Sequence, residues 1–123
     1  METENKKCLC GEGDYNVLAC SGASDVGHIS DLVARKLSKE GVRKMNCLAV
    51  VGAGIEKLIE SFKKSNLLII DGCPVDCGKK IAEKAGIENF SYVRITDLGY
   101  KKGLTEVNET VVNEVYQKVE VLF

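Results

Sequence analysis

The chain has 123 residues, of which 45% are hydrophobic and 28% are charged, and it holds a single proline. This composition excludes collagen-like and low-complexity sequence and is typical of one folded domain. Seventeen Lys and Arg residues oppose 18 Asp and Glu residues, giving a formal net charge of −1, and aromatic residues make up only 6%. Nucleic acid is not expected as a partner, because there is no summed positive field and there are few stacking rings.

Neither a membrane span nor an export signal is expected. The longest stretch without polar or charged side chains runs from Cys47 to Ile55, far shorter than the roughly 20 residues of a spanning helix. The first seven residues, Met1 to Lys7, lack the apolar stretch of a signal peptide. We therefore expect no membrane partner and a cytoplasmic location.

The first half of the chain alternates apolar runs with amphipathic stretches after a polar arm, residues 1–14. Residues 15–20 are predicted to form the first strand. A helix then begins with Ser24 or Asp25 as its N-cap and ends at Gly41, which supplies a left-handed residue.

The second predicted strand, residues 42–48, is placed at an edge of the sheet because Arg43 and Lys44 are charged. A loop at residues 51–54 leads to a helix. Its predicted inner face consists of apolar residues at helical spacing: Ile55, Leu58, Ile59 and Phe62. Residues 66–71 form the third strand, buried on both faces because its middle residues are all apolar.

The second half continues the same pattern. A helix is predicted to begin at Cys73-Pro74, with Pro74 at the first helical position. Residues 90–96 form the fourth strand. The last helix is predicted at residues 105–119, with Thr105 as its cap and one apolar stripe: Val107, Val111, Val115 and Val119.

These elements predict an α/β fold: a single three-layer α/β/α domain, residues 15–123, around a mostly parallel four-stranded sheet. The third strand is the most apolar, so we place it centrally and predict the strand order 2-1-3-4, which is flavodoxin-like. Ligands of such sheets bind outside the carboxyl ends of the strands.

Six cysteines are the one departure from average composition. Cytosolic thiols are kept reduced, so we expect metal or thiol chemistry rather than disulfides. Four cysteines lie at or near the ends of predicted strands: Cys20, Cys47, Cys73 and Cys77. Because neighbouring parallel strands end at the same edge of a sheet, these four thiols are predicted to converge there.

The predicted placement of Cys73 and Cys77 in the first turn of a helix favours thiolate sulfur, because free N–H groups and the positive helix end lie there. Four thiolates suit Zn²⁺, a tetrahedral ion with Zn–S bonds of about 2.3 Å. The alternative is that Cys20 and Cys47 are small buried apolar residues at strand ends. Residue spacing leaves that alternative open.

Three motifs resemble the DGC-domain family, which is named for an Asp-Gly-Cys triplet. They are Asp71-Gly72-Cys73 followed by Pro74 and Cys77, Cys20-Ser-Gly22, and Met45-Asn-Cys47-Leu-Ala49. The resemblance extends from about Tyr15 to Gly99. It implies a zinc site of four cysteines, matching Cys20, Cys47, Cys73 and Cys77 here, and it implies no particular reaction.

Other candidate groups have simpler interpretations. Cys8 and Cys10 lie in the polar arm, where we favour a flexible terminus over a second metal site. For His28, the single histidine, we favour a solvent-exposed helix position over a ligand or a proton shuttle. Three aspartates near the same edge are interpreted as helix caps rather than partners of a metal site: Asp71, Asp76 and Asp97.

The sequence therefore predicts a zinc-binding protein whose metal is held by four cysteines, with its biochemical role and any enzymatic activity left open. The alternative is a thiol-based redox or sulfur-transfer protein, with Cys73 or Cys77 as nucleophile and Cys20 as the resolving thiol. A third hypothesis is a structural adaptor with reduced cysteines.

Overall fold

The structure is a computed structural model that describes residues 14–123. This part of the chain is built around a parallel sheet. Its strands are β2 (Tyr15–Ala19), β3 (Lys44–Met45), β4 (Asn66–Asp71) and β5 (Ser91–Arg94). They lie in the order β3-β2-β4-β5, and each neighbouring pair is parallel. The predicted order 2-1-3-4 is confirmed, with the second strand at an edge. Cys8, Cys10 and all of the predicted polar arm except Asp14 lie outside the described residues.

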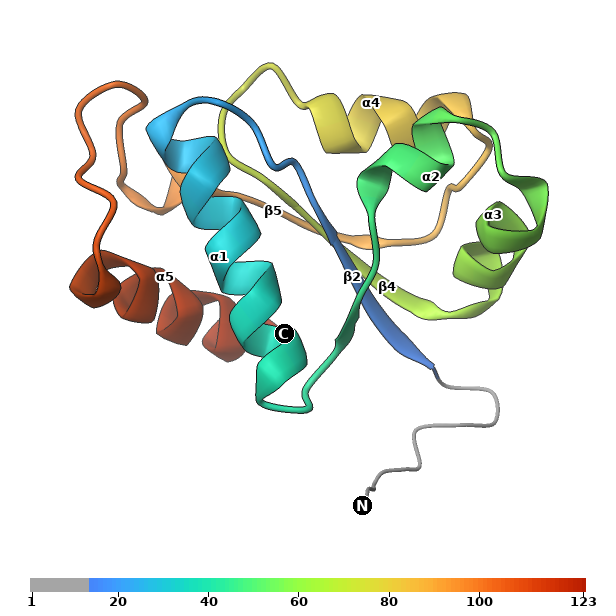
Figure 1. Ribbon diagram of the computed structural model, residues 1–123, viewed down its shortest axis with the longest axis horizontal. Coiled ribbons are helices and arrows are strands. Elements are labelled where there is room, and N and C mark those ends of the chain that lie inside the picture. Colours follow the sequence, from blue (N-terminus) through green and yellow to red (C-terminus); the bar gives the residue numbers. More distant parts are fainter. Residues whose placement is uncertain (1–13) are drawn as a thin grey trace.

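Helices cover both faces of this sheet, as the three-layer prediction requires. The helices are α1 (Asp25–Lys39), α2 (Leu48–Gly52), α3 (Glu56–Lys64), α4 (Cys77–Lys84) and α5 (Glu109–Leu122), and a 3₁₀ turn, η1 (Ile95–Leu98), follows β5. Figure 1 shows α1 and α5 on one side of the sheet and α2, α3 and α4 on the other. Among residues 14–123, no helix combines the length and apolar character needed to cross a bilayer.

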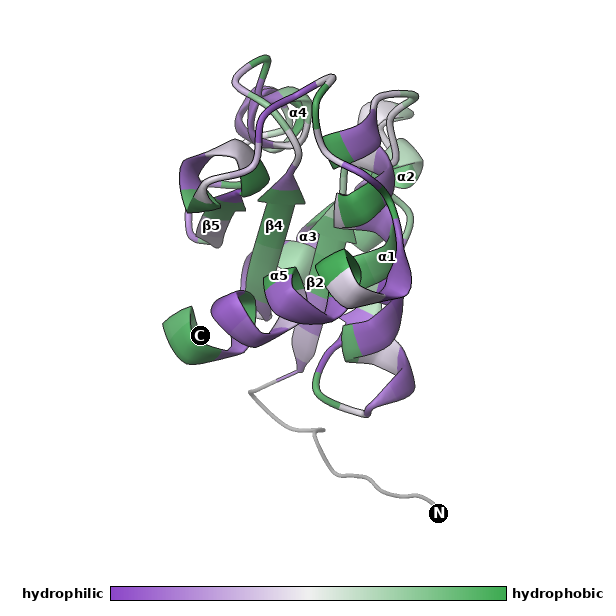
Figure 2. Ribbon diagram, turned by 90° about the vertical axis from the view of Figure 1, so that its left-hand side faces the viewer, coloured by the Kyte–Doolittle hydropathy of each residue, from purple (hydrophilic) through white to green (hydrophobic). Residues whose placement is uncertain are grey.

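The central strand β4 divides its apolar side chains between two cores. Leu68 and Ile70 pack with the buried residues of α1 and α5. Leu67 and Ile69 face the opposite way and pack with α2, α3 and α4. Because successive side chains of a strand alternate between faces, a continuous apolar run supplies both cores. Figure 2 shows this run as the hydrophobic colour along β4.

The predicted second strand, residues 42–48, pairs with β2 only through β3. Arg43 is buried, and its guanidinium donates to the carbonyl oxygens of Asn16 and Asn66 at 3.1 and 2.9 Å. Beyond β3 the chain leaves the sheet, and Cys47 becomes the N-cap of α2. The strand is therefore shorter than predicted, and a short helix replaces the start of the predicted loop.

One predicted helix start is correct and two are wrong. Ser24 caps α1 as predicted, because its side chain accepts the N–H of Gly27 at 3.1 Å. The predicted start of α4 at Pro74 is wrong, since the helix begins at Cys77 after Asp76 in the left-handed conformation, with φ of 61°. The predicted Thr105 cap is also wrong: Asn108 is the N-cap of α5.

A partial error concerns the inner face of α3. Ile59 and Phe62 are buried as predicted, whereas Ile55 and Leu58 are 45% and 36% exposed. Ile55 precedes the helix as its N-cap residue and therefore lies outside the helical stripe.

The Asp25 carboxylate fastens the loop before α5 to the start of α1. The N–H groups of Gly103 and Thr105 donate to it at 2.9 and 3.0 Å, and these bonds hold the pKa of Asp25 below its usual range. A lowered folded-state pKa gives stability that is present above the unfolded pKa and lost as pH falls through the folded one. We expect Asp25→Asn to lower the free energy of unfolding at pH 7 by about 1 kcal/mol.

Urea denaturation at several pH values tests this expectation. The difference between wild type and Asp25→Asn is expected to shrink as the pH falls below about 4, where Asp25 of the unfolded chain binds a proton, and to disappear once the pH passes below the lowered pKa of the folded state. A difference that stays constant down to about pH 2 would show that the charge of Asp25 does not hold this loop.

Candidate site at the carboxyl edge of the sheet

The four cysteines that were predicted to converge all follow strands at one edge of the sheet. Cys20 comes directly after β2, Cys47 lies two residues after β3, Cys73 lies two residues after β4, and Cys77 opens α4. The strands are parallel and β2 is flanked by β3 and β4, so these junctions are neighbours in space. All four residues are free thiols.

The Cys20 sulfur contacts the segment that carries Cys73. The backbone N–H of Gly72 donates to Cys20 Sγ at 3.1 Å, and the Ser30 hydroxyl lies 3.4 Å from the same sulfur. Burial raises the pKa of the Cys20 thiol, and these two hydrogen bonds act against that rise. The junctions after β2 and β4 are thus joined through a cysteine sulfur.

Gly72 allows this junction to form, because its backbone lies against the first turn of α1. A Cβ atom at this position would lie 2.6 Å from the carbonyl carbon of Val26 and 2.7 Å from the nitrogen of Gly27. Side chains do not approach backbone this closely, so only glycine fits between β4 and α1.

Asp71, which is fully buried, caps α4 from the end of β4. Its carboxylate accepts the N–H groups of Gly78 and Lys79 at 2.8 and 3.0 Å. Gly78 must itself be small, since a Cβ there would lie 2.7 Å from Asp71 Oδ1. Asp71 is therefore a helix cap, as interpreted from the sequence, but it belongs to β4 and caps the separate element α4.

Asp76 does not cap α4 with its side chain; it binds Arg94 of β5. The guanidinium donates through Nε and Nη2 to the two carboxylate oxygens, each at 2.8 Å, and this pairing lowers the pKa of Asp76. The Tyr92 hydroxyl lies 2.8 Å from Asp71 Oδ2 and 2.9 Å from Asp76 Oδ1. Asp97 also accepts from Arg94, at 3.0 Å. This network fixes the turn that separates Cys73 from Cys77.

The remaining cysteines differ in their surroundings. Cys73 is half-buried, and the Lys102 ammonium lies 3.4 Å from its sulfur. Cys77 is exposed on the first turn of α4. Cys73 lies outside that helix, so the predicted stabilisation of its thiolate by a helix N-terminus does not apply to it. His28 lies on α1 and is exposed to solvent, which is the position predicted for it.

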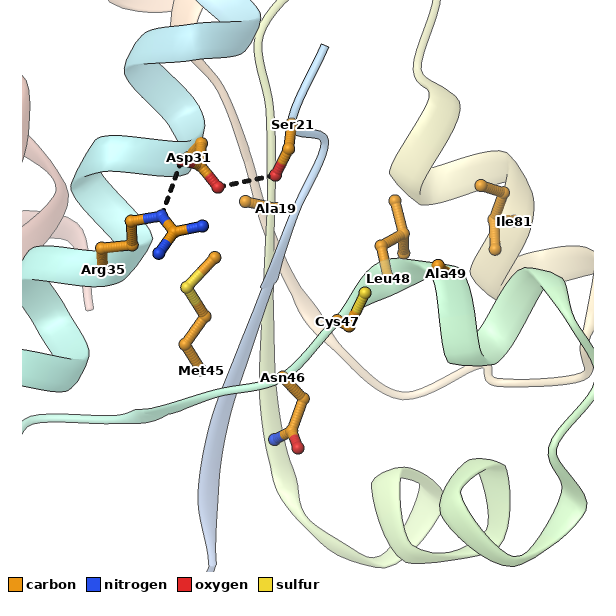
Figure 3. Close-up of a pocket in the computed structure, with 10 residues that line it drawn as sticks. All are labelled: Ala19, Ser21, Asp31, Arg35, Met45, Asn46, Cys47, Leu48, Ala49 and Ile81. Carbon is orange, nitrogen blue, oxygen red and sulfur yellow. Dashed lines mark hydrogen bonds and ion pairs between the residues drawn. The ribbon is translucent and has the colours of Figure 1, made fainter.

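Cys47 lines a pocket of about 540 Å³ between α1, α2 and α4. Figure 3 shows Cys47 at the start of α2 and Ser21, the residue after Cys20, in the segment that follows β2. Cys20, Cys73 and Cys77 do not line this pocket. Cys47 thus shares the carboxyl edge of the sheet with the other three cysteines but faces its own cavity.

The four cysteines suit zinc by the chemistry of their side chains but are not arranged around a single point. Four free thiols at one edge are the ligands that zinc prefers. Within residues 14–123, however, no group of three or more His, Cys, Asp or Glu side chains is arranged to hold a metal ion. The gathering of Cys20, Cys47, Cys73 and Cys77 around one ion therefore stays a prediction.

Comparison with known proteins supports the resemblance noted in the sequence. The sequence profile of the DGC domain matches residues 16–119. The chain belongs to the DGC domain family. It is 29% identical over 87 residues to the anaerobic and virulence modulator AnvM of Pseudomonas aeruginosa, an alignment that covers 70% of this chain and 66% of AnvM. The alignment thus spans slightly less than two thirds of AnvM. No solved structure matches the chain.

Each residue of the Asp-Gly-Cys triplet has a distinct structural role in this DGC domain. Asp71 caps α4, Gly72 packs against α1 and binds the Cys20 sulfur, and Cys73 presents its own sulfur to Lys102. The sequence singled out this triplet but gave no indication of the contact with Lys102, which lies 29 residues further along the chain.

Proposed function

We propose that this DGC-domain protein binds one Zn²⁺ through Cys20, Cys47, Cys73 and Cys77. The observation that carries the proposal is the presence of four free thiols after three neighbouring parallel strands at one edge of the sheet. Zinc, when bound, would link these three strand–helix junctions. A shell of four sulfurs leaves no open position for a water molecule, so the proposed role is metal binding rather than hydrolysis.

The described contacts support a site with one fixed half and one adaptable half. Cys20 and Cys73 are partly buried and belong to junctions joined by the Gly72 N–H. Cys47 and Cys77 are exposed, so they are the two thiols with room to move if four sulfurs are to bind one ion. Lys102, at 3.4 Å from Cys73, would offset part of the net charge of −2 that four thiolates and Zn²⁺ carry together.

Elemental analysis of protein purified without added metal tests the proposal. We expect about one zinc per chain in the wild type, and a lower zinc content in Cys77→Ser, because an exposed ligand is removed without disturbing the core. The matched control is Cys8→Ser, which is expected to keep the wild-type zinc content. A metal-free wild type whose thiols all react freely would contradict the proposal, as would an unchanged zinc content in Cys77→Ser.

A second candidate function is thiol-based redox or sulfur-transfer chemistry at Cys73 and Cys77, and the contact between Cys73 and Lys102 favours it. A neighbouring ammonium group is one of the features that accompany reactive cysteines. The same zinc analysis separates the two candidates, since a metal-free protein with reactive Cys73 would favour thiol chemistry.

A further inference from the structure

The pocket beside Cys47 exists because the edge strand is short. β3 ends at Met45, whose partner is Val17, whereas β2 continues to Ala19. In the described part of the chain, the side of β2 beyond this point is therefore left without a paired strand. The resulting cavity of about 540 Å³ is within the size range of small-molecule sites.

The walls of this pocket are divided into an apolar part and a polar part. Its apolar wall consists of Ala19, Met45, Leu48, Ala49 and Ile81. Most of its polar groups lie toward α1. There, Asp31 accepts a hydrogen bond from the Ser21 hydroxyl at 2.7 Å and one from Arg35 Nε at 2.8 Å. Figure 3 shows the Arg35 guanidinium on the pocket side of α1.

The Arg35 side chain is held in place by one hydrogen bond, and its other two nitrogens remain available. Asp31 occupies only Nε; within residues 14–123 the two terminal nitrogens of Arg35 have no protein hydrogen-bond partner, and the Arg35 side chain is 67% exposed, so these nitrogens are open to a ligand from solvent. Two parallel N–H groups on one planar guanidinium match the two oxygens of a carboxylate. An apolar wall facing this fork matches the hydrocarbon part of the same ligand.

We infer that this pocket binds a small organic carboxylate, with the acid group on Arg35 and an apolar body against Leu48, Ala49 and Ile81. The site goes beyond the proposed zinc centre, with which it shares only Cys47. Zinc content, measured on the same samples, keeps the two proposals separate, because either one can fail while the other holds.

Methyl NMR of protein carrying labelled isoleucines tests this inference, with octanoate as the probe. The Ile81 methyl signal is expected to shift saturably with octanoate, whereas that of Ile95, in the opposite core, is expected to stay in place. Arg35→Gln is expected to weaken octanoate binding about tenfold, because a charged hydrogen-bonded pair is lost. Lys39→Gln, an exposed change of equal charge one turn further along α1, is the matched control and is expected to bind octanoate as the wild type does.

Octan-1-ol, which has the same chain length without the acid, is expected to bind more weakly than octanoate. The inference is overturned if octanoate gives no saturable shift of Ile81, or if Arg35→Gln binds it as tightly as Lys39→Gln. Equal binding of octanoate and octan-1-ol would likewise overturn it, since the pocket would then recognise the chain and not the carboxylate.

Discussion

Replacing Gly72 by alanine is expected to lower the free energy of unfolding by roughly 3 kcal/mol or more. The added methyl group would lie 2.6 to 2.7 Å from three backbone atoms of Val26 and Gly27. These atoms belong to the first turn of α1, which Ser24 caps. Relief of the clash requires α1 to move away from β4, and this movement would open the core that contains Val26 and Ile70.

Chemical denaturation monitored by circular dichroism measures this loss. Gly52→Ala is the matched control, because Gly52 lies in α2, its backbone φ is not positive and a Cβ there meets no atom within 4 Å. We expect that control to be neutral or slightly stabilising, since alanine is the better helix former. Similar stabilities for the two variants would show that the close approach of β4 and α1 is not required for folding.

Asp71→Asn is expected to lower the free energy of unfolding by about 2–4 kcal/mol. The buried carboxylate accepts two N–H groups of α4 on separate oxygens and lies 2.8 Å from the Tyr92 hydroxyl. An asparagine of the same shape keeps one acceptor and points an NH₂ group at a donor that it cannot satisfy. The N-terminal end of α4 would thereby lose its cap, and the position of Cys77 would become less defined.

Asp97→Asn is the matched control for Asp71→Asn. Asp97 is an exposed partner of Arg94, and exposed ion pairs contribute less than about 1 kcal/mol. Both variants remove one negative charge near the same edge, so a difference between their urea midpoints reports on burial and capping. Equal midpoints would contradict the assigned role of Asp71.

The fold could be predicted because the strands carry their own signal. Four consecutive apolar residues in β4 indicate a strand buried on both faces, and the edge strand β3 contains the charged, exposed Lys44. Boundaries that depend on distant partners could not be predicted. Thr105 has the chemistry of an N-cap, but its N–H is bound by Asp25, 80 residues earlier in the chain.

The candidate site was predictable at the level of the sheet edge and not at the level of side chains. Strand ends place Cys20, Cys47 and Cys73 at one edge whatever the rotamers are. Side-chain directions depend on contacts that no local pattern contains, such as the bond from Gly72 to Cys20 and the pairing of Asp76 with Arg94. The pocket beside Cys47 was not predicted either, because it results from the point at which β3 ends.

X-ray absorption at the zinc edge of the purified protein tests the central claim most directly. Binding by Cys20, Cys47, Cys73 and Cys77 predicts a shell of about four sulfur atoms at about 2.3 Å from the ion. Protein without zinc, or a shell dominated by nitrogen and oxygen at about 2.0–2.1 Å, would contradict the claim that these four thiols hold the metal.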